Sequence, residues 1–317
     1  MQYNAQTRRE IKKAARAQVQ AHIGRCIAVR LLYTVPYILL GLLLYLAAFR
    51  TPLRLLAAGA YYESMMAFAL SRGANTAWLI GAVTLVLSGP LGFGLMRFYI
   101  GLHRGEEAEV SQLWQPFTAR RSLWAGVRMG FALFARQLLR LLLPTVLVCG
   151  VVLTVVFAAI FAGGALMTDW NAAFTAMCAL YLLALFLIWV RLLADQSGWV
   201  LLREDERRGA WDAARDGASA FRGHYGSLVG FVLSFAGWYV LAAALGGLCM
   251  LLALGGLYFL SGGIGVAVFA ASQVAWLCIS VLLGGYFGAY FRVSLVGLFE
   301  HFAARTDRAA APQDETD

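Results

Sequence analysis

The sequence predicts an all-α, polytopic integral membrane protein with six transmembrane helices and further amphipathic helices at the membrane interface. Its 317 residues are 61% hydrophobic and 14% charged, whereas soluble domains are about half apolar and roughly a quarter charged. The apolar residues gather in six long blocks, separated by connections of which several are rich in arginine. No block alternates apolar and polar residues, as the strands of a membrane β-barrel do. We therefore expect one helical membrane domain over residues 1–304 and a polar, disordered tail over residues 305–317.

Each apolar block is long enough to cross a bilayer as a helix, because roughly 20 residues rising about 1.5 Å each span a hydrocarbon core of about 30 Å. The predicted spans lie near residues 31–49, 74–100, 141–167, 172–193, 227–254 and 264–291. The first block is too long for the apolar region of a secretory signal peptide, and a long basic segment precedes it. We expect it to remain as a transmembrane helix.

The arginines and lysines predict the orientation, since basic residues on short loops favour the cytoplasmic side. They are concentrated before the first span and in the connections from the second span to the third and from the fourth to the fifth. Both termini are therefore predicted to face the cytoplasm. The net charge of +9 is expected to attract anionic lipid headgroups of the inner leaflet, by about 1 kcal/mol per basic residue near the surface. No nucleic-acid reader motif accompanies this charge, so we expect no nucleic-acid partner.

The N-terminal segment, residues 7–23, has the pattern of an amphipathic helix. Apolar residues recur every four positions on one face, and a basic row occupies another; the apolar residues are Ile11, Ala15, Val19 and Ile23. This pattern predicts a helix that lies on the inner leaflet of the membrane. A helix that docks on a partner, like a calmodulin target, is the alternative.

The second span is interrupted by a glycine-rich segment with a proline, which comprises Gly89, Pro90, Gly92 and Gly94. Proline removes a backbone donor and glycines loosen the helix, so the sequence predicts a kink or two half-helices. A kink that serves only packing is one interpretation. The other is a binding site near the membrane midplane, because transporters use interrupted spans in this way.

The two large inner connections resemble each other. Each starts with a charged run and continues into a helix with an aromatic face, and the segment from Gly126 to Gly130 has a counterpart from Gly226 to Gly230. A duplicated unit of span, inner helix and span would explain this, and shared membrane composition is the alternative. These glycines, together with Gly284 and Gly288, are predicted helix-packing positions, since small residues let helices approach closely. We expect this packing within one chain, with a homo-oligomer as the alternative.

A resemblance to a known family is carried by GPLGFGLMRFYIGLHRGEEAEVSQLW, from Gly89 to Trp114, and AWDAARDGASAFRGHYGSLVGFVLSFAGWYVL, from Ala210 to Leu241. Both resemble the bacterial domain-of-unknown-function family 975, and REIKKAARAQV, from Arg9, is similar to the start of those proteins. The chain departs from the family pattern in its fourth span, which has no Pro-Gly, and in its last span, which reads GGYFGAYFRVSLVG. A fainter similarity links it to the membrane domain of some glycerophosphodiesterases. The resemblance implies a six-span protein of the bacterial inner membrane and implies no activity.

Motifs for catalysis and metal binding are absent from the sequence. It contains no HExxH, GxSxG or GxxxxGK[ST] motif and no His/Cys cluster at metal spacing. We therefore expect no enzyme, no cofactor and no metal site. The acidic groups of the inner connections are expected to be solvated, and a cation or acid–base pair is the alternative; they are Glu106, Glu107, Glu109, Glu204, Asp205 and Glu206. The five cysteines are expected to be small buried apolar residues.

Four ionisable residues fall within or near the predicted spans, where charges are costly and often functional. Arg191 and Asp195 stand four residues apart, a spacing that allows a salt bridge on one helix face. Arg97 lies toward the end of the second span, and Arg292 ends the sixth. Together they define a candidate vestibule for an anionic lipid headgroup or substrate at the cytoplasmic end. Snorkelling combined with local pairing is the alternative.

Three functions are compatible with these features. The first is a non-enzymatic membrane protein that organises lipid or a partner. The second is a transporter or channel for a small or anionic substrate, and the third is an accessory role in lipid metabolism. A water-accessible cavity near residues 88–94 would favour transport, whereas a closed bundle with a groove on its inner face would favour the first function.

Overall fold

The computed structural model describes residues 4–44, 46, 63, 73–161, 170–259 and 263–310. These residues form helices joined by short turns, and no strand occurs among them. Six helical segments within them are long and apolar enough to cross a membrane: Ile23–Leu44, Thr76–Arg104, Arg120–Val151, Met177–Glu204, Ala236–Gly256 and Ala267–Ala304. The prediction of an all-α, polytopic protein with six spans is confirmed.

The helices fall into long membrane elements and short connecting elements. The long ones are α2 (Ile23–Leu44), α5 (Gly73–Arg104), α7 (Arg120–Phe161), α8 (Trp170–Gln196), α12 (Ala236–Phe259), α13 (Gly263–Leu283) and α14 (Ala289–Ala310). The short ones are η2 (Val110–Leu113), α6 (Gln115–Thr118), α9 (Gly198–Glu204), α10 (Ala210–Ser219) and α11 (Tyr225–Leu233), and α1 (Ala5–Ala21) precedes them all. A π-helical turn, η4 (Gly284–Gly288), joins α13 to α14.

Two boundaries differ from the predicted ones. The helix of the third span begins at Arg120, because the cationic segment before residue 141 continues into it without a break. Helix α14 continues over residues 305–310, where alanine-rich sequence favours a helix; the disordered tail over residues 305–317 stays a prediction. Residues 311–317 and parts of the predicted first and third spans lie outside the described residues.

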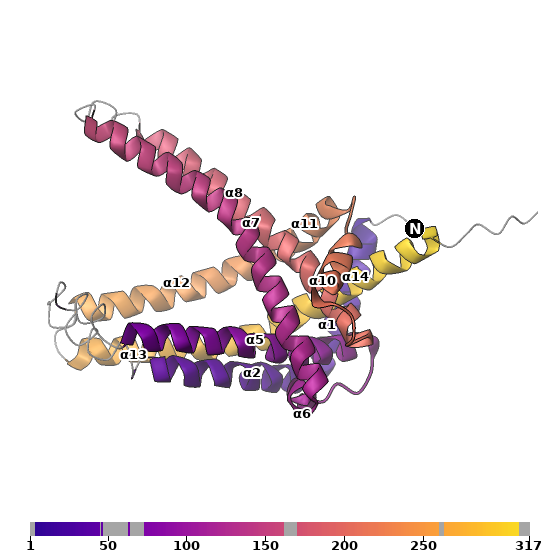
Figure 1. The fold of residues 1–317 in the computed structure, drawn as a ribbon. Helices are drawn as coiled ribbons and strands as arrows, with labels where there is room; N and C mark the ends of the chain where they lie inside the picture. Colours follow the sequence, from indigo (N-terminus) through magenta and orange to yellow (C-terminus); the bar gives the residue numbers. More distant parts are fainter. Residues whose placement is uncertain are drawn as a thin grey trace, which may run out of the picture.

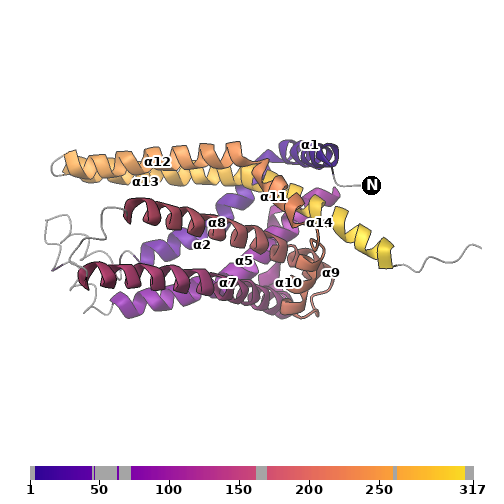
Figure 2. The same ribbon diagram turned by 90° about the horizontal axis from the view of Figure 1, so that it is seen from above.

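The short helices gather at one end of the molecule (Figure 1). Ion pairs such as Arg97–Glu206, Arg104–Glu204 and Arg203–Glu106 join elements there, and we call it the charged end. It holds α1, α6, α9, α10 and α11, together with the C-terminal part of α14. From it α2, α5, α12 and α13 run in one direction, while α7 and α8 leave as a pair at an angle. Figure 2 shows α12 beside α13 and α7 beside α5 along the view from above, and both pairs are in contact.

The diverging pair of α7 and α8 is covered by few other side chains. None of the described side chains of residues 141–151 and 177–185 is buried. The two helices contact each other, and the hydroxyls of Thr145 and Tyr181 lie 3.2 Å apart between them. We call these residues the arm. Nearer the charged end, the Trp189 ring of α8 packs against Tyr239 of α12, so the two helices are in contact there.

The hydrophobic core lies at the charged end of the bundle. Its largest fully buried side chains include Phe93, Phe98, Tyr99, Phe231 and Phe235. Phe231 lies in α11 and Phe235 in the turn that joins α11 to α12, and their rings pack edge to face with centroids 5.3 Å apart. Aromatic burial of this kind holds the ends of the spans together, because each ring removes a large apolar area from solvent.

The face of the N-terminal helix α1 that carries Ala15 and Val19 contacts protein. Asn4 caps it by accepting a hydrogen bond from the Thr7 backbone N–H at 2.9 Å. Ala15 and Val19 are fully buried, and the helix packs along α14. Lys12 donates to the Ser234 carbonyl at 3.0 Å, which satisfies a backbone group at the end of α11. The sequence predicted lipid beneath this face, and α14 covers part of it instead.

Candidate functional site

A cavity of about 250 Å³ lies where α5, α7 and α8 separate. Tyr33 of α2 and Arg292 of α14 complete its wall. The polar lining residues are Tyr33, Ser88, Gln137, Gln196, Trp199 and Arg292, and the remaining lining residues are Leu85, Gly92, Leu95, Met96, Gly130, Leu133, Phe134 and Leu192. The site therefore combines apolar walls with a few polar groups, which is the usual character of a ligand pocket.

Glycines bring α5 and α7 together beside this cavity. A methyl group at Gly126 would lie 2.8 Å from the Pro90 Cα atom, and one at Gly130 would lie 2.7 Å from the Gly89 Cα atom. Only glycine permits helices to cross this closely. The predicted packing role of Gly126 and Gly130 is thus visible in the structure, within one chain.

The glycine-proline segment of the second span does not divide it. Helix α5 runs unbroken from Gly73 to Arg104 with Pro90 inside it, so the prediction of two half-helices is wrong. The glycines instead provide room for neighbours. A methyl group at Gly94 would overlap the Leu113 backbone, and one at Gly92 would lie 3.8 Å from the Trp199 ring.

The other predicted packing glycines have different surroundings. The Arg30 side chain lies over Gly284, and a methyl group added at Gly284 would lie 3.0 Å from the Arg30 Cζ atom. Gly230 is beside Arg8, which donates to the Gly230 carbonyl at 3.1 Å. Among the described residues, nothing lies within 4 Å of a methyl group at Gly226 or Gly288. The segment from Gly226 to Gly230 therefore lacks the close helix crossing that the segment from Gly126 to Gly130 makes, because α11 ends before α12 begins.

Among the residues that the structure describes, Arg292 is the only charged one that lines the cavity. Its Nη1 atom lies 3.5 Å from the Met96 sulfur, a weak acceptor. No carboxylate within the described part of the chain forms an ion pair with it. The cavity thus holds a guanidinium group whose charge the surrounding protein leaves unmatched.

Arg97 faces a different environment from Arg292. It forms an ion pair with Glu206, and its guanidinium carbon lies 4.6 Å from the centre of the Phe93 ring. Glu206 also accepts a hydrogen bond from the Ser122 hydroxyl at 2.7 Å. This arginine joins α5 to the connection after α9 and has its own counter-ion.

Asp195 does not pair with Arg191, contrary to the spacing on α8. Its side chain is 0% exposed and accepts a hydrogen bond from Arg136 at 2.9 Å and others from Arg140, both on α7. Arg191 is exposed, and its guanidinium carbon lies 5.7 Å from the Tyr225 ring centre. The local pair was expected because both residues are on one helix, but α7 brings two arginines to the buried face. The predicted vestibule is therefore divided, and only Arg292 reaches the cavity.

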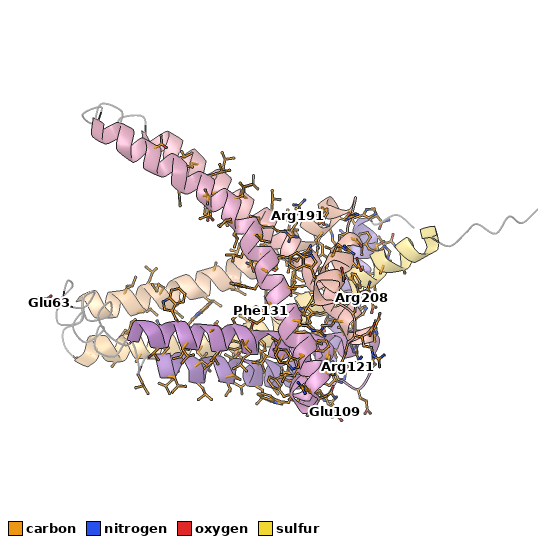
Figure 3. All side chains as sticks on the ribbon, in the orientation of Figure 1. Glu63, Glu109, Arg121, Phe131, Arg191 and Arg208 are labelled. Carbon is orange, nitrogen blue, oxygen red and sulfur yellow. The ribbon has the colours of Figure 1, made fainter. Side chains whose placement is uncertain are left out.

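Ion pairs also join the two inner connections to each other. Arg203 pairs with Glu106, and Arg104 pairs with Glu204 at 2.7 Å. Farther along the second connection, Arg208 donates to Asp216 at 2.6 Å and holds the pKa of that carboxyl below its ordinary value. Figure 3 shows the corresponding concentration of nitrogen-bearing side chains at the charged end. Three of the six predicted solvated acids, Glu106, Glu204 and Glu206, are paired with arginines there.

The polar lining residues other than Arg292 were not singled out from the sequence. Gln137 and Gln196 make no side-chain hydrogen bond with any described residue. Both glutamines lie outside the predicted spans and each follows a charged residue, Arg136 or Asp195, so the sequence carries no signal that separates them from solvated amides. Within the described chain, no group of three or more His, Cys, Asp or Glu residues could hold a metal ion.

Fold and site together define an all-α membrane protein with a polar cavity between its spans. No family model, curated protein or solved structure matches the chain.

Proposed function

We propose that this chain is a non-enzymatic protein of the bacterial inner membrane that binds the anionic headgroup of a membrane lipid in the cavity at Arg292. The observation that carries this function is the unmatched guanidinium group on the cavity wall. A charge removed from water is costly unless an opposite charge accompanies it. An anionic ligand would supply that charge.

The orientation proposed here puts the charged end and both termini in the cytoplasm. The support is the distribution of basic residues, which favour the cytoplasmic side of short loops. The inner leaflet carries the anionic lipids that such a surface attracts. The resemblance to the domain-of-unknown-function family 975 agrees with a bacterial inner membrane.

Lipid suits the cavity better than a soluble anion because apolar side chains surround its polar groups. Phe134 lines the cavity and is 45% exposed, so part of the rim is open and apolar. Beyond it, Leu138 and Leu142 of α7 are more than half exposed. Acyl chains would cover these side chains while the headgroup remains at Arg292.

Mass spectrometry of the intact protein released from lipid nanodiscs tests this function. We expect the wild-type protein to retain an anionic lipid and Arg292→Gln to retain roughly ten- to a hundredfold less, since a hydrogen bond to a charged group contributes about 1.5–3 kcal/mol. Arg128→Gln is the matched control, because Arg128 is an exposed arginine of α7 outside the cavity. Equal retention by Arg292→Gln and the wild type would refute the proposed function.

Transport of a small anion is a second candidate, and one observation favours it. The cavity touches Ser88 and Gly92 in the middle of α5, where a transporter's binding site is expected. Anion efflux from sealed liposomes that contain the protein distinguishes the two functions. Efflux that depends on Arg292 would support transport, whereas lipid retention without efflux would support lipid binding.

A further inference from the structure

We infer that the cavity selects a lipid whose headgroup is a phosphodiester with a single negative charge and free hydroxyl groups, as in phosphatidylglycerol, an inference that rests on the proposed function. The selection is against two other headgroup classes. One is a phosphomonoester, as in phosphatidate, and the other carries an ammonium group, as in phosphatidylethanolamine.

The charge of the lining determines the first part of this selection. The cavity has one guanidinium group and no carboxylate among its lining residues. A phosphodiester carries one negative charge and matches it. A phosphomonoester carries about −1.5 to −2 near neutral pH, which leaves excess negative charge in a site with apolar walls. An ammonium group would stand near Arg292 with no carboxylate to pair with, and like charges at close range are unfavourable.

The hydrogen-bonding groups determine the second part. The amides of Gln137 and Gln196 are each able to accept and donate, and neither has a side-chain partner among the described residues. The Ser88 hydroxyl donates to the Leu85 carbonyl at 2.7 Å, which leaves its oxygen free to accept. Hydroxyl groups of a ligand both donate and accept, so they match this set. Ser88, Gln137 and Gln196 are partly buried, and a ligand without hydroxyl groups would cover them and leave them unpaired, so the site favours a ligand that has such groups.

The size of the cavity limits what part of the lipid it holds. Pockets that enclose a drug-sized molecule are about 300–1,000 Å³, and this cavity is about 250 Å³. A headgroup fits and the acyl chains do not. The chains leave past Phe134 and lie along the exposed leucines of α7, which places the lipid beside the arm.

Competition among lipids with identical acyl chains tests this selection. The full-length protein is placed in nanodiscs that contain equal amounts of phosphatidylglycerol, phosphatidate and phosphatidylethanolamine, and the retained lipid is measured by mass spectrometry. We expect at least fivefold more phosphatidylglycerol than either competitor. Retention that depends on Arg292 but favours phosphatidate or phosphatidylethanolamine would overturn the selection and leave the proposed function in place. Retention that does not depend on Arg292 would overturn both.

Variants of the two amides test the hydroxyl recognition separately. Gln137→Leu and Gln196→Leu are expected to lower the ratio of phosphatidylglycerol to phosphatidate at least threefold while Arg292-dependent retention continues, which also shows that the variants are folded. Gln273→Leu is the matched control, since Gln273 is an exposed amide of α13 outside the cavity. An unchanged ratio in both cavity variants would contradict recognition by the amides. The wild-type competition decides the selection even if a variant does not fold.

Discussion

At the scale of single residues, the buried acid Asp195 shows most clearly how a charge within the described spans depends on its counter-ions. Its carboxylate is fully buried, and two arginines from α7 surround it. Removing one member of a buried ion pair leaves an uncompensated charge, which costs about 3–5 kcal/mol. The triad therefore joins α7 to α8 at the base of the arm.

We predict that Asp195→Asn lowers the free energy of unfolding by about 3–5 kcal/mol, because Arg136 and Arg140 lose their counter-ion. Arg191→Gln should change it by less than about 1 kcal/mol, since Arg191 is exposed and only faces the Tyr225 ring. Equilibrium unfolding in mixed micelles measures both. Equal losses in the two variants would instead indicate the local pair on α8.

The partners of Asp195 show why residue spacing predicts this site incompletely. Spacing along one helix identifies neighbours three or four positions apart. The observed partners are 59 and 55 residues away in the sequence, so no helical period relates them. The sequence singled out Arg292, but its neighbours in the cavity come from five other helices, α2, α5, α7, α8 and α9.

At the scale of elements, the crossing of α5 and α7 determines where the cavity lies. Gly89 and Pro90 of α5 meet Gly126 and Gly130 of α7 with backbone in contact with backbone. Beyond the crossing, the helices separate (Figure 1). Gly130 both packs at the crossing and lines the cavity. A larger side chain here would move α7 and change the cavity with it.

We predict that Gly126→Ala destabilises the protein by about 1–3 kcal/mol, because the added methyl group would lie 2.8 Å from the Pro90 Cα atom. A methyl group added at Gly150, in the same helix, would have nothing within 4 Å, so Gly150→Ala should cause no loss of stability. Thermal unfolding in a single detergent compares the two. A loss of the same size at Gly150 would show that the close crossing is not the cause, since alanine has the higher helix propensity at both positions.

The suspected duplication has a counterpart in the elements of the structure. In both units a span leads into a charged turn, a short inner helix and another span. The units differ after the inner helix, since α7 is one helix of 42 residues whereas α11 ends and α12 begins around Ser234. Glu106 and Glu206, at equivalent positions, each pair with an arginine from the other unit. Sequence similarity predicted the units but not the exchange of ion pairs between them.

At the scale of the whole molecule, composition was enough to predict the fold. Apolar blocks of span length require helices in a bilayer, because every backbone group must be satisfied within the segment. The same reasoning does not place one helix against another. Tyr33, Ser88, Gln137 and Arg292 meet only because α2, α5, α7 and α14 converge, and helix packing depends on contacts that periodicity does not encode.

We predict that the two ends of the molecule face opposite sides of the membrane, with the charged end inside. Figure 3 labels Glu63 at one end and Arg121 at the other. In a cysteine-free background, Glu63→Cys should react with a membrane-impermeant maleimide in intact spheroplasts, and Arg121→Cys should react only after permeabilisation. The reverse pattern would invert the proposed orientation.

The separation of the arm from the other spans has a mechanical consequence. None of the described side chains of the arm is buried, so few contacts within the described part of the chain fix the angle of the arm to α5 and α12. The thickness and lateral pressure of the surrounding bilayer would then determine how far the arm tilts. The part of α7 that lines the cavity lies between its crossing with α5 at Gly130 and the arm. We therefore expect a change in the tilt of the arm to change the shape of the cavity.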